Sequence, residues 1–189
     1  MAQFLGVEET KGPRGAGRPR RGRPAGRARE PEGGGLFKAA DSGAAQAQAA
    51  IAGGAARGGR LPIYYPTVFA ESSRFVDTPR AYRIRTPAGG VETAYRMVLQ
   101  GRLVGDYYGV QGTTWKDPPT LEGDSEERTV GGRTFELHYD GDRVRLVAWR
   151  TDKAVYWVSN TLLQTLSERQ MLAIARETRL PEPTAPGKR

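Results

Sequence analysis

The sequence predicts an α+β domain in which an antiparallel sheet of five or six strands carries one C-terminal helix, preceded by a disordered basic arm. Three observations favour this class. Short runs of alternating apolar and polar residues recur between residues 61 and 160, which is typical of strands with one solvent-facing side. A helical apolar period begins near Ser167. Residues 1–60, in contrast, contain no Trp and no Tyr.

Residues 1–60 form the expected arm, in which Gly, Ala, Arg and Pro predominate. They carry eleven Lys or Arg and five Asp or Glu, so most of the formal net charge of +8 lies there. A segment with so little apolar surface cannot offset its ordering entropy, and we therefore expect disorder. Within the arm, the Ala-rich stretch 36–52 favours a weak helix that Gly53 and Gly54 end.

One short motif in the arm is similar to a DNA-binding element. Arg21, Gly22, Arg23 and Pro24 resemble the core of an AT-hook, whose two Arg side chains enter a narrow A·T minor groove. Arg20 stands where that motif has Pro, and there is a single copy. The tetrapeptide also fits a solvated basic tail with weak, non-specific affinity for nucleic acid, or a wrongly assigned start of the chain. These interpretations stay open.

The folded part is expected to span residues 61–180, followed by a disordered tail at 181–189. The runs at 80–86 and 91–100 flank the four-residue loop 87–90, which contains two glycines, and together they predict a hairpin. The next run contains Gly109 and Gly112, which indicate a bulge or a close backbone approach. An acidic loop follows. The runs that predict these first strands cover residues 61–66, 80–86, 91–100 and 105–115.

The best-specified pair of strands is a hairpin around Asp140-Gly141, a dipeptide typical of two-residue turns. A last strand at 154–160 has apolar residues on both faces, so it should be central in the sheet. In the hairpin, apolar residues face apolar ones and an acid faces a base. The expected opposite pairs are Tyr139–Asp142, Leu137–Val144, Phe135–Leu146, Glu136–Arg145 and His138–Arg143.

The C-terminal helix has a complete start signal. Ser167 predicts the N-cap, and Gln170 completes a capping box. Leu166 and Met171 suit a hydrophobic staple, so the apolar side of this helix should pack across the sheet. The polar stretch 159–161 is then the joint between sheet and helix rather than an active-site loop.

The composition excludes several classes of site. With no Cys and one His, the chain has no thiol nucleophile, no disulfide and no Cys- or His-rich zinc site. The acidic residues of 117–127 lack EF-hand spacing, and no phosphate-loop motif is complete, so we expect no catalytic residue, metal or cofactor. No apolar run reaches the ~20 residues of a spanning helix, and the first residues lack the apolar core of a secretory signal.

Aromatic and basic side chains in Gly- and Pro-rich segments indicate a candidate surface for an anionic or sugar-bearing ligand. The alternative is that these rings cap the ends of the sheet. The candidate residues are Tyr64, Tyr65, Arg83, Arg85, Tyr107, Tyr108 and Trp115.

Three stretches, YYGVQGTTWKDPP, GGRTFELHYDGDRVRLVAWRTDKAVYWVSN and LSERQMLAIA, together resemble the C-terminal accessory region of certain actinobacterial LytR-CpsA-Psr family proteins, over roughly residues 61–180. The resemblance implies an extracytoplasmic cell-envelope setting and partners such as an anionic cell-wall polymer or an envelope transferase domain. That family transfers polyprenyl-phosphate-linked glycopolymers to peptidoglycan. Its catalytic domain precedes the matched region and has no counterpart in residues 1–60, so no catalytic residue carries over.

The resemblance leads us to expect a non-catalytic accessory or binding domain of the bacterial cell envelope, detached or truncated from a larger transferase. A nucleic-acid-associated protein that binds DNA through its basic arm is the alternative.

Overall fold

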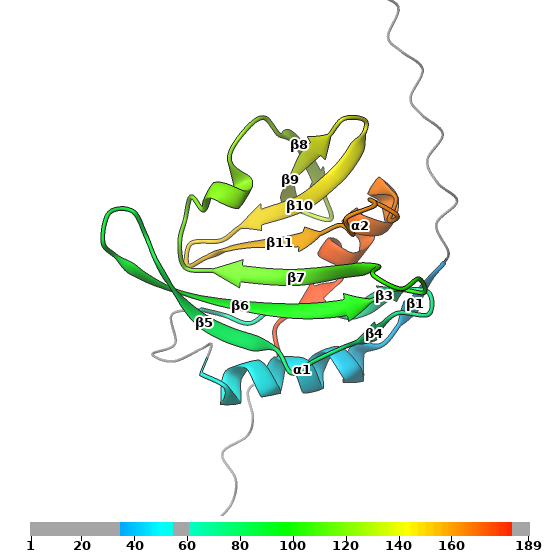
Figure 1. Ribbon diagram of the computed structural model, residues 1–189, viewed down its shortest axis with the longest axis horizontal. Helices are drawn as coiled ribbons and strands as arrows, with labels where there is room; N and C mark the ends of the chain where they lie inside the picture. Colours follow the sequence, from blue (N-terminus) through cyan, green and yellow to red (C-terminus); the bar gives the residue numbers. More distant parts are fainter. Residues whose placement is uncertain (1–34, 55–60, 183–189) are drawn as a thin grey trace, which may run out of the picture.

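An antiparallel sheet of eight strands dominates the computed structural model, which describes residues 35–54 and 61–182 (Figure 1). The sheet order is β4-β6-β7-β11-β10-β9-β8, and β5 also pairs with β6. The strands are β4 (Arg74–Phe75), β5 (Arg80–Arg85), β6 (Val91–Gln100), β7 (Tyr107–Thr113), β8 (Glu126–Val130), β9 (Arg133–Asp140), β10 (Arg143–Arg150) and β11 (Val155–Ser159).

The α+β class and the antiparallel pairing are confirmed, whereas the expected number of strands is wrong. Five or six were expected and the sheet has eight. The charged segment Glu126–Val130 forms edge strand β8, although it lacks the apolar alternation of the other strands. The two-residue strand β4 is too short to leave a pattern in the sequence.

Two helices and two small sheets complete the described structure. The helices are α1 (Ala40–Ala52) and α2 (Glu168–Arg176), and a 3-10 turn, η2, spans Pro119–Leu121. Both helices contribute buried side chains to the main core cluster on one side of the eight-stranded sheet. The small sheets pair β1 (Leu36–Lys38) with β3 (Val68–Ala70), and β2 (Tyr65–Pro66) with β12 (Thr178–Arg179).

Helix α1 belongs to the core, although the sequence placed it in the arm. Ala47 and Ala50 are fully buried. Gly43 lies so close to β2 that a Cβ there would stand 2.3 Å from the Pro66 carbonyl oxygen. The structure thus differs from the expected boundary at residue 61. The small side chains that gave this stretch little apolar surface are the ones that let the helix approach the core.

Helix α2 begins as predicted. The Ser167 hydroxyl accepts a hydrogen bond from the Gln170 N–H, and the Gln170 side-chain oxygen accepts one from the Ser167 N–H at 2.9 Å. Leu166 and Met171 are buried in the same core cluster, and so is Ile174. The capping box and the inward apolar face are therefore confirmed.

The hairpin of β9 and β10 exists, but the predicted register is wrong. Its two-residue turn is Gly141-Asp142, with Gly141 at a φ of 59°, so that Asp140 pairs with Arg143. A bulge between Val144 and Leu146 then shifts the register again. Because of the bulge, Val144 and Val147 both reach the helix-covered core. The observed pairs are Asp140–Arg143, Tyr139–Val144, His138–Leu146, Leu137–Val147 and Glu136–Ala148.

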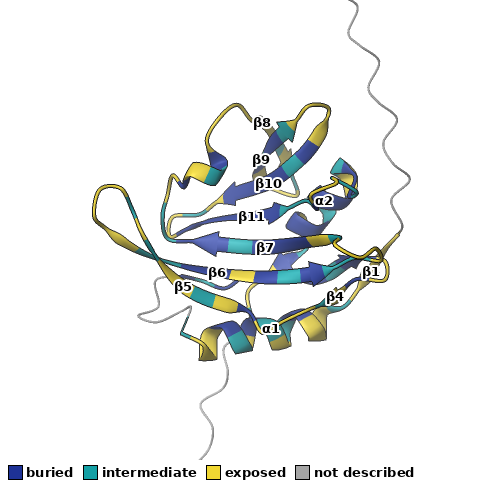
Figure 2. Ribbon diagram, viewed as in Figure 1, coloured by how far each residue is buried: buried dark blue, intermediate teal, exposed yellow. Residues whose placement is uncertain are grey.

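Strands β10 and β11 are buried on both faces, as expected for central strands (Figure 2). Trp149 and Tyr156 stack on the helix side with ring centroids 5.3 Å apart. On the opposite side a smaller apolar cluster forms under the 3-10 turn. It contains Leu121, Leu146, Ala148, Val155 and Trp157.

Candidate functional site

The face of the sheet opposite the helices carries a groove of about 510 Å³. Leu146 and Trp157 lie in its floor, the segment around Pro119 forms one wall, and Tyr82 of β5 forms the other. A second depression of about 660 Å³ continues along the same face and shares lining residues with the first, among them Gln111 and Asn160. We refer to the two together as the open-face groove.

Strand pairing sets one row of side chains across the floor of this groove. Residues directly opposite each other in neighbouring antiparallel strands point to the same face. The row crosses five strands, from β5 through β6, β7 and β11 to β10. In order, it contains Arg80, Arg96, Gln111, Trp157 and Ala148.

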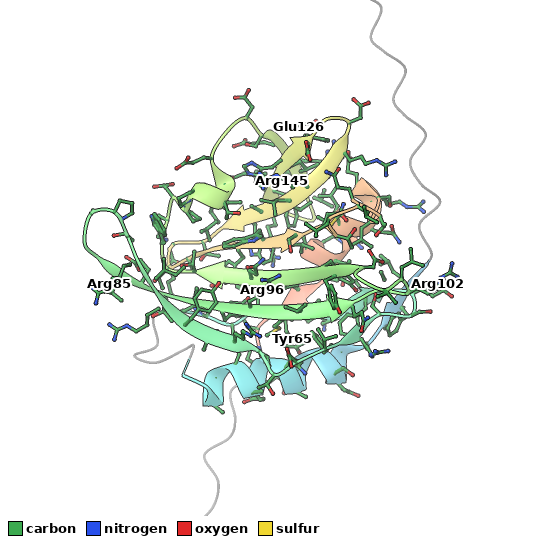
Figure 3. All side chains as sticks on the ribbon, in the orientation of Figure 1. Tyr65, Arg85, Arg96, Arg102, Glu126 and Arg145 are labelled. Atoms are coloured by element: carbon green, nitrogen blue, oxygen red, sulfur yellow. The ribbon has the colours of Figure 1, made fainter. Side chains whose placement is uncertain are left out.

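Arginines outnumber carboxylates along the open-face groove. It is lined by Arg80, Arg96 and Arg145, against Asp77 and Asp140. Figure 3 shows Arg96 and Arg145 near the middle of the open face.

These arginines are weakly engaged. Within residues 35–54 and 61–182, neither Arg96 nor Arg145 has an ion pair, and Arg145 makes only a long bond of 3.5 Å to the Thr120 carbonyl oxygen. Arg80 stands 4.0 Å from Asp77, with both side chains mostly exposed. The guanidinium groups therefore have donors left for an anion.

One residue that lines the groove has a buried acceptor without a partner in the described chain. Gln164 lines the groove and donates from Nε2 to Asp140 at 2.8 Å, but its buried Oε1 accepts no hydrogen bond. Gln164 also has a φ of 51°, a left-handed backbone conformation that is uncommon for a residue other than Gly. An unsatisfied buried acceptor costs free energy.

The structure does not bring the seven predicted surface residues together. Tyr64 packs edge-on against Tyr156, with ring centroids 4.8 Å apart, while Tyr65 and Tyr108 are buried in the main core cluster. The Tyr108 hydroxyl accepts a hydrogen bond from the Ala70 N–H at 3.1 Å. These three rings therefore have structural contacts.

The other four predicted residues are spread over the molecule. Arg83 and Arg85 alternate with Tyr82 and Ile84, which line the groove, so the two arginines point to the opposite face of β5. Figure 3 shows Arg85 at one end of the molecule. Trp115 and Tyr107 do line the groove, but in different depressions.

Sequence reasoning missed the residues that form the floor. Neither Trp157 nor Arg96 is among the seven predicted surface residues. Strand alternation places both residues on the open face once the register is known. The register was not predictable, because the row across the sheet joins segments far apart in the chain. For Trp157, the signal that could have found it was its place on the same strand face as the apolar Val155.

His138 is buried and does not lie at its predicted position opposite Arg143. The shifted register sets it opposite Leu146. Its Nε2 lies 3.8 Å from Glu136 and has no hydrogen-bond partner in the described structure. Burial lowers the pKa of His138 below its ordinary value of 6.5, against the attraction of Glu136. His138 does not line the groove.

Other functional features are absent from the part of the chain that the structure describes. No three His, Cys, Asp or Glu side chains there are grouped to hold a metal ion, and no helix there has the length and apolar character to cross a membrane. The AT-hook-like residues Arg21, Gly22, Arg23 and Pro24 lie outside the described residues. Comparisons with protein-family models, with curated proteins and with solved structures find no match to this chain.

Proposed function

We propose that this chain is a non-catalytic binding domain of a bacterial cell envelope, and that its open-face groove holds an acidic polysaccharide. The observation that carries the proposal is the row in which Trp157 and Gln111 continue into Arg96 and Arg80. An aromatic side chain packs against the apolar face of a sugar ring, and amides bond its hydroxyl groups. Arginines bind carboxylate or phosphate groups in a bidentate manner.

The shape of the groove favours a polymer over a small, enclosed ligand. Small-molecule sites usually bury 70–90% or more of their ligand. Here two open depressions share Gln111, Ser159, Asn160 and Leu162, and together they extend from Trp115 to Tyr107. A chain of several sugar units would cross both depressions and leave one side in solvent.

The envelope setting of this proposal comes from the sequence resemblance to the accessory region of LytR-CpsA-Psr proteins. The groove supports the binding role through chemistry that fits an anionic cell-wall polymer. The proposal assigns no transfer reaction to this chain.

Calorimetric titration tests the ligand class. The probes are trigalacturonate, an acidic trisaccharide, and maltotriose, a neutral one of the same length. Arg96→Thr removes a cation from the groove, and Arg85→Thr makes the same change on the opposite face of β5. We expect trigalacturonate to bind the natural chain at least tenfold more tightly than maltotriose, and Arg96→Thr to lose most of that preference while Arg85→Thr keeps it.

Two outcomes would overturn the proposal. One is equal binding of the two trisaccharides, or no binding of either. The other is an equal loss of affinity in the two Arg variants, because that would indicate general electrostatic attraction rather than a site.

A further inference from the structure

Two loop tips at one end of the sheet carry the most exposed large apolar side chains of the described structure. Leu103 and Val104 are 54% and 100% exposed, and Leu162 and Leu163 are 94% and 78% exposed. The first pair lies in the turn after β6 and the second in the loop after β11. These strands run the same way on either side of β7, so both loops emerge at the same end of the sheet (Figure 1).

The two loops are joined into one surface. The Thr165 hydroxyl donates a hydrogen bond to Asp106 at 2.8 Å, which links the loop after β11 to the turn after β6. Leu103 and Leu163 line one shared depression, together with Arg102 and Arg143. We call Leu103, Val104, Leu162 and Leu163 the apolar tip.

The loop that presents Leu162 and Leu163 is held in place by Asn160. The Asn160 side-chain nitrogen donates to the carbonyl oxygens of Val144 and Leu166, at 2.8 and 2.9 Å. Its side-chain oxygen accepts from the N–H groups of Thr161 and Leu166, at 2.8 and 3.2 Å.

Further hydrogen bonds close the same loop. The Thr161 hydroxyl accepts from the Thr165 N–H, and the Gln164 N–H donates to the Thr161 carbonyl oxygen, both at 3.0 Å. Several backbone groups of the loop are thus satisfied internally, which lowers the cost of moving the tip into an apolar environment. The leucines are held outward on an ordered loop.

We propose that the apolar tip docks this protein on a phospholipid bilayer. The four apolar side chains enter the boundary between headgroups and acyl chains, and Arg102 and Arg143 at the rim bind lipid phosphates. Neither arginine has an ion pair within the described ranges. Arg143 donates one bond, to the Gln164 carbonyl oxygen at 3.2 Å.

The carboxylates near the tip are mostly engaged. Asp106 is bonded by Thr165, Asp140 by Gln164, and Glu71 by the Gly35 N–H. Asp142, in the β9–β10 turn, is exposed. Hydrogen bonds from neutral donors leave these carboxylates charged, so the two arginines and four carboxylates named here sum to −2. The preference for an anionic bilayer therefore comes from the net charge of +8 of the whole chain.

The size and shape of the tip favour a bilayer over a protein partner. A stable protein interface uses about 20–30 residues on each side. The tip offers four apolar side chains on protruding loops, which is far fewer. A bilayer needs no complementary surface, since each side chain that enters it loses contact with water independently.

Co-sedimentation with vesicles of phosphatidylcholine and phosphatidylglycerol tests this docking surface. The test variant is Val104→Ser with Leu163→Ser, because neither residue lines the open-face groove. The control is Val91→Ser, an exposed apolar residue at the start of β6, the opposite end of that strand from the tip. All variants keep the charge of the chain, so electrostatic attraction through the basic arm is the same in each.

We expect the double variant to partition at least tenfold more weakly than the natural chain, with its melting temperature unchanged, and Val91→Ser to bind as the natural chain does. If the double variant bound vesicles as well as Val91→Ser does, the proposal would be overturned, because the arm alone would then account for vesicle binding. The proposal would also be overturned if the double variant lost self-association, measured by analytical ultracentrifugation, while its vesicle binding stayed unchanged. The tip would then be an interface between two copies. No vesicle binding by the natural chain would also overturn it.

Discussion

Arg80 of β5 lies directly opposite Arg96 of β6, in the row that continues to Gln111 and Trp157. Like charges at directly opposite positions destabilise an antiparallel pair. Within the described residues only Arg80 of the two has an ion pair, with Asp77 at 4.0 Å, and that pair is mostly exposed. The open face thus holds two arginine side chains whose mutual repulsion destabilises the strand pair. This is the arrangement expected of residues that bind an anionic ligand.

Replacing Arg96 should stabilise the protein while it weakens ligand binding. Arg96→Thr removes the repulsion with Arg80 and introduces a residue that favours strands. We expect the free energy of unfolding to rise by about 0.2–1 kcal/mol, measured by urea denaturation. Arg83→Thr, on the other face of β5, provides the control and should change stability less. A loss of stability in Arg96→Thr would show that this guanidinium supports the fold.

Gly43→Ala in α1 should lower the free energy of unfolding, although helix propensity alone predicts that a Gly to Ala change raises it. In an exposed helix interior the change stabilises by about 1 kcal/mol. At Gly43 the added Cβ would stand 2.3 Å from the Pro66 carbonyl oxygen and 2.7 Å from the Tyr65 ring. Gly43→Ala should therefore destabilise the protein by about 1–3 kcal/mol.

Ser42→Ala is the matched change on the exposed side of α1 and should be neutral or slightly stabilising. Thermal unfolding of the two variants decides whether α1 is docked on β2. Stabilisation by Gly43→Ala would mean that the helix does not pack there.

Asn160 should be the most sensitive residue of the segment between β11 and α2. Its side chain makes four hydrogen bonds, to Val144, Leu166 and Thr161. Each is worth about 0.5–1.5 kcal/mol, and unsatisfied partners add to the loss, so Asn160→Ala should cost about 2–4 kcal/mol. Ser159→Ala loses only a long bond of 3.5 Å to Gly109 and should cost far less. Equal losses in chemical denaturation would contradict this role for Asn160.

His138 should make stability fall as the solution becomes acidic. Burial lowers its pKa in the folded chain; Arg145 and Arg150 lower it further, and Glu136 opposes them. Below its ordinary pKa of 6.5, the unfolded chain therefore binds a proton that the folded chain does not. The His138 contribution is complete above that pH and is lost as the pH falls toward the folded pKa.

Urea denaturation from roughly pH 7.5 down to pH 5.5 measures this dependence. His138→Gln, which cannot titrate, should show a smaller decline over the same range. An identical decline in the variant and the natural chain would assign the effect to other groups.

The parts of the fold that could be predicted depend on residues close together in the chain. Ser167, Gln170 and Met171 define the start of α2 within five positions, and the structure has that helix as predicted. The burial of β11 on both faces likewise followed from its own composition. In these cases local sequence and tertiary packing favour the same answer.

The register of β9 and β10 could not be predicted, because it depends on contacts that the hairpin does not contain. A bulge beside Arg145 lets Val144 and Val147 reach the same core, and it turns Leu146 to the open face. Helix α1 was missed for a related reason. Its Ala and Gly residues carry little apolar surface, and they pack closely only because Pro66 and its neighbours are there.

The candidate site was the least predictable feature, since its residues come from at least five separate strands and from loops. Tyr64, Tyr65 and Tyr108 have the composition of a binding surface but lie in or against the core. Trp157 and Arg96 meet through Gln111 only after β6, β7 and β11 pair. Residue types alone therefore indicated the ligand chemistry that we propose but not the positions that would carry it.

The three tryptophans allow the most direct test of the open-face groove as a binding site. Trp115 and Trp157 line it, whereas Trp149 is buried in the core on the helix side. The measurement is a two-dimensional NMR titration of the indole N–H resonances with trigalacturonate. We predict that the Trp157 and Trp115 resonances shift in a saturable way while the Trp149 resonance stays in place. Saturable binding that leaves the resonances of Trp115 and Trp157 unmoved would contradict the account.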